Sequence, residues 1–257
     1  MSRHSNIEIV DPLKWPAEQS AAIVCDMWNE HWSRGATERV DLLAPKMNTL
    51  IRRLRNNGLQ VVHAPTHTMG FYEGTPARMR IQAVPLLEPP GSVIDYNFPF
   101  DPPLSIDDSD GGSDTGEEPP RKFQRVWTRQ HPDIEIDHER DVISDLGVEI
   151  YSFLRGRGRF NVFIMGVHAN MCVLKRQFGI RQMQEWGFNM ALVGDMTDSM
   201  YNPTMSPNVS HEEGTRLVVE YIRRYWCPVV YSNDLYPENQ QLPPGQGGIS
   251  PFLFPTG

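Results

Sequence analysis

Residues 161–173 have the sequence NVFIMGVHANMCV, and the prediction of the fold starts here. The first seven residues, NVFIMGV (161–167), form an apolar run with the length of a buried β-strand. A short turn follows, and from about Met171 the apolar residues recur at helical spacing. The stretch therefore predicts a strand that passes directly into a helix, with Cys172 at the start of that helix.

Five other apolar or β-branched runs resemble residues 161–167, and longer segments of helical period separate them. Strands that are apolar on both faces and alternate with helices are typical of a parallel sheet covered on both sides. The predicted fold class is α/β: a three-layer α/β/α sandwich with a mostly parallel, six-stranded, Rossmann-like sheet. The predicted strands are residues 21–26, 59–65, 124–129, 161–167, 189–195 and 228–233.

The longest predicted helix lies between the first two strands. It has Thr37 as its N-cap and Gly58 just past its end. Three further helices are predicted at about residues 141–157, 171–186 and 211–226. Apolar side chains of the first helix recur three or four residues apart, at Val40, Leu43, Met47, Leu50 and Leu54.

A single domain is predicted over residues 1–237. Residues 99–120, rich in Pro, Gly, Ser and acids, interrupt the alternation as an acidic insertion. Residues 238–257 form an extended C-terminal tail, and its PFLF run suits docking on an apolar surface of a neighbouring subunit. We expect a homo-oligomer, although the tail alone does not determine the oligomeric state.

The composition restricts the location and the partners. The 257 residues include 39% hydrophobic residues, but no apolar run is long enough to span a bilayer and no secretory signal is present, so a cytoplasmic protein is expected. Three cysteines, Cys25, Cys172 and Cys227, are an odd number, and each is expected to be a reduced thiol. The absence of a basic stripe or of a DNA- or RNA-binding motif argues against nucleic acid as a partner.

The net charge of −8 is concentrated in one segment. Residues 101–118, DPPLSIDDSDGGSDTGEE, contain seven acids and no Lys or Arg, so the rest of the chain is nearly neutral. The favoured interpretation is a solvated excursion, because such a composition cannot bury a core. The alternative is a cation site, although Gly112 at a ligand position and the missing closing glutamate differ from an EF-hand loop.

Two reactive side chains follow strands of the predicted sheet. Open parallel sheets bind ligands beyond the carboxyl ends of their strands, where Asp26 ends the first strand and Cys172 follows the fourth. A helix N-terminus lowers the pKa of a thiol, and a neighbouring carboxylate can accept the proton. Cys172 is therefore a candidate nucleophile, and the alternative is a small buried apolar residue.

Two motifs favour the nucleophile. IVCDMWNEHW (23–32) resembles the first-strand D-M-x-N motif of the isochorismatase-like cysteine hydrolases, which include nicotinamidases, N-carbamoyl amidohydrolases and isochorismatases. GVHANMCV (166–173) resembles the G-V-x-x-x-x-C-V motif of the same family. The resemblance extends from about Ala21 to Leu235 and rests on both motifs at their correct relative positions.

The resemblance implies an Asp, Lys, Cys triad in which Asp26 is the general base and Cys172 is the nucleophile. It also implies a cis peptide bond between Val167 and His168. The backbone N–H groups of His168 and Cys172 would then form an oxyanion hole. Attack on a carbonyl would give a thioester and release ammonia or an amine.

The chain departs from the family at the lysine. The resemblance places that residue at the fourth position of VWTRQH, which is Arg129. A guanidinium stabilises a thiolate by its charge but does not shuttle a proton, because its pKa lies above about 12. The alternative is that Lys122 reaches the site from the insertion.

Several further residues are candidates for contact with a substrate, either as pocket walls or as core. The nicotinamidase branch binds a metal through an Asp-x-His motif, of which this chain retains His67 but has Pro65 in place of the aspartate. We therefore expect no cofactor and no metal; a divalent metal at His67 or in the acidic insertion is the alternative. The candidate substrate-binding residues are Trp28, His31, His67, Asn170 and Tyr201.

The sequence predicts a cysteine-dependent amidohydrolase that cleaves the C–N bond of a small amide, ureide or carbamoyl compound through a thioester. One alternative is an isochorismatase-like ether hydrolase, in which the aspartate protonates a vinyl ether and no thiol is required. The other is a catalytically weak member of the family that binds a ligand in the same pocket. The expected partner is a small-molecule substrate, and neither nucleic acid nor a membrane is expected.

Overall fold

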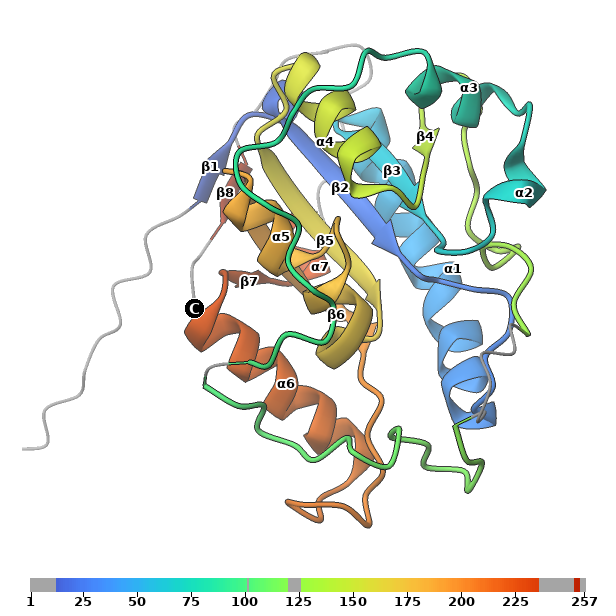
Figure 1. Ribbon diagram of the computed structural model, residues 1–257, viewed down its shortest axis with the longest axis vertical. Coiled ribbons are helices and arrows are strands. Elements are labelled where there is room, and N and C mark those ends of the chain that lie inside the picture. The colour runs from blue at the N-terminus through green and yellow to red at the C-terminus, as the bar shows by residue number, and fades with distance from the viewer. Residues whose placement is uncertain (1–12, 101, 120–125, 236–251, 255–257) are drawn as a thin grey trace, which may run out of the picture.

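The computed structural model of the protein describes residues 13–100, 102–119, 126–235 and 252–254. These residues form a six-stranded, all-parallel sheet with the order β4-β3-β2-β5-β6-β7 (Figure 1). The predicted parallel sheet is therefore confirmed. Its strands are β2 (Ser20–Cys25), β3 (Gln60–Ala64), β4 (Val142–Ile143), β5 (Asn161–Val167), β6 (Asn189–Asp198) and β7 (Val229–Val230).

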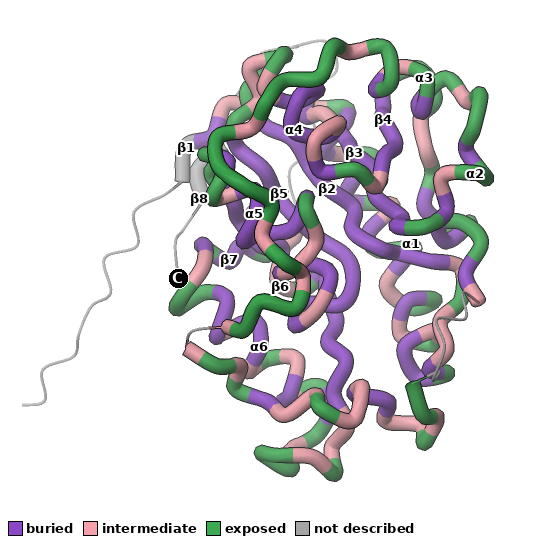
Figure 2. Tube along the Cα trace, in the orientation of Figure 1, coloured by how far each residue is buried: buried purple, intermediate pink, exposed green. Residues whose placement is uncertain are grey.

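Helices cover both faces of this sheet, which confirms the three-layer α/β/α prediction. Side chains alternate along β2, so that Ala22 and Val24 pack with α1, whereas Ile23 packs in a cluster with α4, α5 and α6. The central strands are buried along their length (Figure 2). The helices are α1 (Arg34–Asn56), α2 (Met69–Tyr72), α3 (Pro76–Gln82), α4 (Gly147–Gly156), α5 (Ile180–Glu185), α6 (His211–Tyr225) and α7 (Ser232–Leu235).

The strand order determines where a site can form. The chain begins the sheet at β2, continues outward to β3 and β4, and then crosses back to β5 on the other side of β2. The carboxyl ends of β2 and β5 therefore flank the point where the strand order reverses, which is the usual ligand site of such sheets.

One predicted strand, residues 124–129, is wrong. Residues 126–129 have no strand structure, and β4 occupies the edge of the sheet instead. The backbone N–H groups of Thr128 and Arg129 donate to the side chain of Asn29, at 2.9 and 3.0 Å, instead of to a neighbouring strand. A local contact with the loop after β2 thus replaces the predicted ladder.

The helices differ from the predictions mainly at their starts. The first helix begins at residue 34, because Ser33 is its N-cap and Thr37 donates its hydroxyl proton back into the preceding turn. The helix predicted over 141–157 starts at residue 147, after β4. The helix predicted over 171–186 is split into a π-helical turn (Ala169–Val173) and α5. The helix predicted over 211–226 is confirmed as α6.

The two ends of the described chain pair with each other. β1 (Leu13–Trp15) and β8 (Phe252–Phe254) form a two-stranded antiparallel sheet. Residues 252–254 of the predicted tail therefore pair with a strand of this same chain. Residues 238–251 and 255–257 of the tail, like Lys122, lie outside the described residues.

Residues 102–119, hereafter the acidic strap, do not form the predicted solvated excursion. Ile106 is buried in the main core cluster, and Asp114 forms an ion pair with Arg39 of α1 at 2.7 Å. Gly112 has a φ of 77°, and a Cβ there would lie 2.4 Å from the backbone carbon of Met200. The prediction fails because carboxylates of this segment accept hydrogen bonds from buried and half-buried donors, which lets the segment pack.

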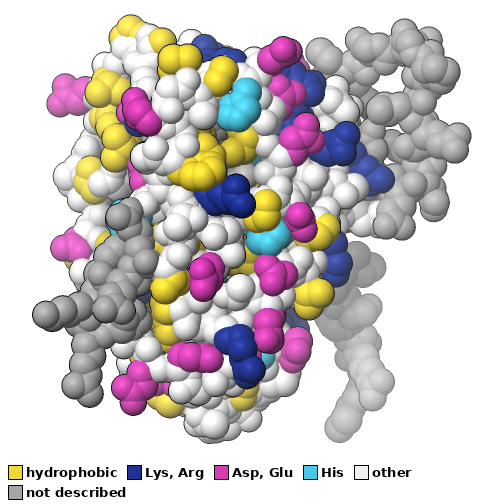
Figure 3. Space-filling view, turned by 90° about the vertical axis from the view of Figure 1, so that its right-hand side faces the viewer, with side chains coloured by type: hydrophobic (Ala, Val, Ile, Leu, Met, Phe, Trp, Pro, Cys, Tyr) yellow, Lys and Arg dark blue, Asp and Glu magenta, His cyan; other side chains and the backbone are white. Residues whose placement is uncertain are grey.

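None of the described helices combines the length and the apolar content that a transmembrane span requires. On the face that lies to the right in Figure 1, acidic and basic side chains are interspersed with apolar ones (Figure 3).

Candidate active site

Asp26 lies directly after β2, at the point where the strand order reverses. Its backbone has a φ of 46°, a left-handed conformation that Asp tolerates better than most residues, and its side chain is fully buried. One carboxylate oxygen accepts a hydrogen bond from the backbone N–H of Thr66 at 2.7 Å. The other accepts one from Nε of Arg176 at 3.0 Å. The carboxylate is thus fixed in an otherwise apolar region.

The segment after β5 brings Cys172 to the same place. Gly166, with a φ of 114°, lies so close to β2 that a Cβ would be 2.0 Å from the carbonyl oxygen of Cys25. The peptide bond between Val167 and His168 is cis, as the resemblance implies. The π-helical turn that follows contains Cys172, whose thiol is buried and has the Asp26 carboxylate as a hydrogen-bond partner.

The pKa of the Cys172 thiol differs from the expectation. Burial raises it to about 12, and the charge of Asp26 acts in the same direction, whereas the charge of Arg176 lowers it. The sequence predicts a lowered pKa from a helix N-terminus, but the turn around Cys172 spans only five residues and α5 starts at Ile180. The thiol is therefore protonated at neutral pH and needs a base.

Among the described residues, the cation that contacts Asp26 is Arg176, and Arg129 lies elsewhere. The Arg129 side chain is exposed, and its Cζ lies 5.4 Å from the centre of the Phe71 ring. Arg176, four residues after Cys172, is the cation that contacts Asp26. The nearby Asp26 and the Cys172 thiol raise its pKa further, so the guanidinium stays charged. Assigning the family position to the wrong segment is the reason for the error, because residues 126–129 do not form a strand of the sheet.

Tyr96 is a further member of the site that the sequence patterns did not indicate. Its hydroxyl lies 3.9 Å from Sγ of Cys172. The ring lies between two cations, with Cζ of Arg176 at 5.4 Å and Nζ of Lys175 at 5.6 Å from its centre. Burial raises the pKa of the Tyr96 hydroxyl. The one available signal is that Tyr96 belongs to an alternating aromatic run with Phe98 and Phe100.

Residues 84–100, the segment that carries Tyr96, are irregular in structure but are attached to α4 and α5. The backbone N–H of Leu87 donates to Oγ of Ser152 at 2.8 Å, and that of Ile94 donates to Oε1 of Gln182 at 2.6 Å. Arg181 donates to the carbonyl oxygen of Phe98. These contacts determine the position of Tyr96, and sequence spacing does not reveal them.

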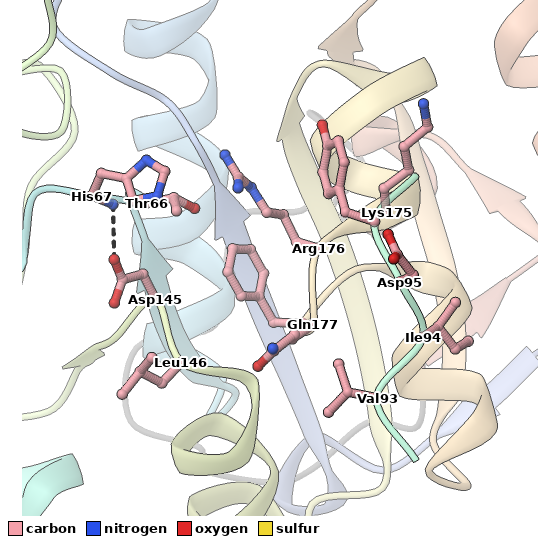
Figure 4. Close-up of a pocket in the computed structure, with 12 residues that line it drawn as sticks. Thr66, His67, Val93, Ile94, Asp95, Asp145, Leu146, Lys175, Arg176 and Gln177 are labelled. Carbon is pink, nitrogen blue, oxygen red and sulfur yellow. Dashed lines mark hydrogen bonds between the residues drawn. The ribbon is translucent and has the colours of Figure 1, made fainter. Parts of the chain in front are cut away.

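A cavity of about 430 Å³ adjoins the Asp26–Cys172 pair. This volume lies in the range of small-molecule sites. Arg176 and Thr66, both labelled in Figure 4, line the cavity and contact Asp26, and Tyr96 lines it and contacts Cys172. Asp26 and Cys172 do not line the cavity themselves and lie behind these residues. Of the predicted substrate-binding residues, His67 lines this cavity.

Trp28 and His31 are part of an aromatic stack beside the site. The ring centres of Trp28 and Trp127 are 4.1 Å apart, and those of His31 and Trp127 are 5.9 Å apart. The His168 ring packs edge-on against His31 at 5.1 Å. Burial lowers the pKa of both histidines, in the case of His168 to about 4, so both rings are neutral at neutral pH.

Asn170 and Tyr201 have structural contacts. Asn170 donates to the carboxylate of Asp108 in the acidic strap at 2.8 Å, and its carboxamide also bonds both backbone groups of Met200. Tyr201 is fully buried, and its hydroxyl donates to the carbonyl oxygen of Met205. Neither residue lines the described cavity, and their contact with a substrate stays a prediction.

Carboxylates of the acidic strap accept hydrogen bonds from other side chains of the protein. Asp110 accepts from Asn202 at 2.8 Å, as Asp108 does from Asn170. Groups of three or more His, Cys, Asp or Glu side chains that could hold a metal ion do not occur among the described residues. His67 contacts the carboxylate of Asp145 through its backbone N–H, at 2.8 Å.

The solved structures to which this chain is similar include proteins described as a cysteine hydrolase and an isochorismatase. A cysteine hydrolase from Pseudomonas syringae pv. phaseolicola 1448A has a TM-score of 0.51 and 16% identity, with 89% of this chain and 96% of that chain covered. An isochorismatase from Pseudomonas putida KT2440 has a TM-score of 0.48 and 14% identity, with 86% and 91% covered. No protein-family model and no curated protein sequence matches the chain.

The likeness to the Pseudomonas syringae protein shows a common fold. The chain is thus an α/β protein with the fold of a cysteine hydrolase. A fold shared with a cysteine hydrolase agrees with what the two sequence motifs predict.

Proposed function

We propose that the protein is a cysteine-dependent hydrolase that cleaves the C–N bond of a small amide, ureide or carbamoyl compound. The observation that carries this proposal is the buried Asp26 carboxylate, which is hydrogen-bonded to the Cys172 thiol beside a cavity of small-molecule size. Nucleophile and base within hydrogen-bond reach, with the base oriented by a third group, are the usual arrangement for covalent catalysis. The third group is Arg176, which bonds the carboxylate.

Asp26 would be the general base, because the thiol is protonated at rest. As Asp26 takes the proton from Sγ, the sulfur attacks the carbonyl carbon and the carbonyl π electrons move to its oxygen. Arg176 stays charged throughout and offsets the negative charge, since its pKa is raised. Among the described residues of the site, proton transfer then runs through Asp26, which differs from a triad with a lysine.

Three groups would assist the later steps. The backbone N–H groups of His168 and Cys172 would donate to the oxyanion, and the Tyr96 hydroxyl would donate to the sulfur while it is a thiolate. When the C–N bond breaks, Asp26 returns the proton to the leaving nitrogen, and ammonia or an amine departs. A water molecule, deprotonated by Asp26, then hydrolyses the thioester and regenerates the thiol.

The test is the release of ammonia from a panel of amides, nicotinamide, ureides and carbamoyl amino acids. We expect turnover of at least one class by the wild type and a loss of at least about 10³-fold in Cys172→Ala and in Asp26→Asn. Cys227→Ala is the matched control, because it removes another buried cysteine that lies outside the site and is expected to keep full activity.

The same panel separates the alternatives. Activity on a vinyl ether that persists in Cys172→Ala would indicate an ether hydrolase instead. Ligand binding without turnover of any compound, together with a Cys172 that iodoacetamide labels no faster than Cys25 or Cys227 in the folded protein, would indicate a binding protein.

A further inference from the structure

The cavity next to Cys172 has two chemically different ends. Thr66, His67 and Arg176 lie at one end, where Arg176 and Thr66 also contact Asp26 (Figure 4). Leu146 and Val93 lie at the opposite end and face each other across the open space (Figure 4). The reacting group of a substrate belongs at the first end, since Arg176 and Thr66 there contact Asp26, the proposed base.

The apolar side chains of this end are exposed, and the polar side chain drawn beside them is the uncharged amide of Gln177 (Figure 4). Leu146 is 46% and Val93 is 53% exposed, and Ile94 and Phe178 continue the apolar wall between them. Leu146 extends from the start of α4 and Val93 from the segment 84–100, so two separate parts of the chain supply this surface. Exposed apolar side chains that converge on one cavity are typical of a ligand site.

The charges along the cavity disfavour an anionic ligand. Asp145 and Asp95 lie on opposite sides of the path between the two ends (Figure 4). The ammonium of Lys175 packs over the rings of Tyr96 and Phe100, at 5.6 and 5.1 Å, and is directed away from the apolar end (Figure 4). The positive charge of Arg176 is already balanced by Asp26. Among the described residues that line the cavity, a carboxylate on the distal part of a substrate would therefore meet two acids, while both cations have other partners.

We infer that the substrate is an amide with an uncharged, apolar arm, whose amide group lies against Arg176 and Tyr96 and whose arm lies between Leu146 and Val93. This inference rests on the proposed function and specifies its substrate class. Leu146 and Val93 are then the residues that determine specificity, because they contact only the arm.

The test is a series of linear primary amides: acetamide, butyramide and hexanamide. Burial of each methylene adds about fourfold to kcat/KM, so hexanamide is expected to exceed acetamide by at least about 50-fold. Two analogues of equal length carry a charged tip: the monoamide of adipic acid and 6-aminohexanamide. Both are expected to be poorer substrates than hexanamide, and the carboxylate to be the poorest.

Leu146→Ala and Val93→Ala are expected to lower kcat/KM for hexanamide by about fivefold each while leaving that for acetamide unchanged. Leu42→Ala is the matched control, because Leu42 is a 71% exposed leucine of α1 that does not line the cavity. The solution mass of each variant is expected to equal that of the wild type. A changed mass would show that Leu146 and Val93 belong to a subunit interface and would overturn the inference.

The two proposals fail in different ways. If amide hydrolysis depends on Cys172 but not on chain length, the inference of an apolar arm would be overturned. A preference for either charged tip would overturn it too. In both cases the proposed hydrolase activity would stand. Calorimetric titration of Cys172→Ala with the same amides provides a readout without turnover. If the affinity of Cys172→Ala rises with chain length but the wild type hydrolyses none of the amides, the binding site between Leu146 and Val93 would be supported. The proposed hydrolase activity would be rejected.

Discussion

The carboxyl edge of the sheet has two parts that differ in how the chain reaches them. At β2 and β5, Asp26 and the turn with Cys172 follow their strands directly, and the backbone of the strand determines where they lie. Between α3 and β4, by contrast, residues 83–141 form a long excursion, and Tyr96 reaches the site only through contacts with α4 and α5. Residues next to a strand can be placed from sequence, whereas residues on a long connection are placed by tertiary packing.

The largest expected effect concerns the two arginines of these two parts. Arg176→Met is expected to lower kcat by about 10²–10³-fold, because it leaves the buried Asp26 carboxylate without its cation. Arg129→Met is the matched control and is expected to change kcat by less than about twofold, since that side chain is exposed. Steady-state kinetics on the best amide of the panel measures both.

Equal losses in the two variants would contradict the placement of Arg176. Arg176→Lys adds a second comparison, because it keeps the charge but offers a group that can transfer a proton. A rate above that of Arg176→Met is expected if charge is the main contribution.

The second prediction concerns stability against pH. His168 is buried with a pKa near 4, so the unfolded chain binds a proton more readily than the folded one between pH 6.5 and 4. Its contribution to stability is therefore complete above pH 6.5 and is lost as the pH falls. At pH 5 the loss is about 2 kcal/mol, from about 1.4 kcal/mol per pH unit below 6.5.

Urea unfolding at pH 7.5 and pH 5.0 measures this effect. His168→Phe is expected to reduce the pH dependence by that amount, and His138→Phe, at an exposed position of the excursion, is expected to leave it unchanged. His211 has the opposite effect on the pH dependence of stability, because Asp198 raises the pKa of His211. The test is therefore the difference in pH dependence between each variant and the wild type, and not the wild-type slope alone. Equal slopes in wild type and His168→Phe would exclude a buried neutral ring.

The third prediction concerns Tyr96, the side chain of residues 83–141 that contacts the Cys172 thiol in the described part of the chain. Tyr96→Phe keeps the ring between Lys175 and Arg176 and removes the hydroxyl that lies 3.9 Å from Sγ. We expect kcat to fall about tenfold, as is usual for the loss of one hydrogen bond to a charged group. Tyr225→Phe, at a 44% exposed position, is the control. An unchanged kcat in Tyr96→Phe would mean that the hydroxyl does not act on the thiolate.

The smallest effect is expected from the acidic strap. Asp108→Ala removes the acceptor of Asn170 and should lower the free energy of unfolding by about 1 kcal/mol. Asp107→Ala, at the neighbouring position, removes only a hydrogen bond within the strap and should stay within about 0.5 kcal/mol of the wild type. Chemical denaturation distinguishes the two. Identical values would show that the strap does not support the turn that contains Cys172.

The comparison also explains which sequence predictions succeed. The parallel sheet follows from apolar runs, and the cis peptide bond and the proximity of Asp26 to Cys172 follow from motifs that end strands. The described part of the predicted strand, residues 126–129, is not a strand of the sheet, because Asn29 binds the backbone of that segment, and Arg129 is exposed there. Composition alone predicts a solvated strap, since it does not reveal that donors elsewhere in the chain form hydrogen bonds to the carboxylates of the strap.

Arg176 and the raised pKa of Cys172 have a common origin in the split helix. The sequence spacing is compatible with one continuous helix from Met171, in which the thiol would be at the N-terminus. In the structure the helix stops after a π-helical turn, and Arg176, in the break that follows it, contacts Asp26. The burial that results from this tertiary packing determines the pKa more than helix position does.

The most direct measurement is the intact mass of the protein, acid-quenched during turnover of its best amide, followed by digestion. The account predicts that the acyl group of the amide adds to the peptide that contains Cys172, that added hydroxylamine removes it, and that Cys172→Ala neither carries the mass nor turns over. Steady turnover with no added mass, retained in Cys172→Ala, would contradict the account, because catalysis would then not pass through this thiol.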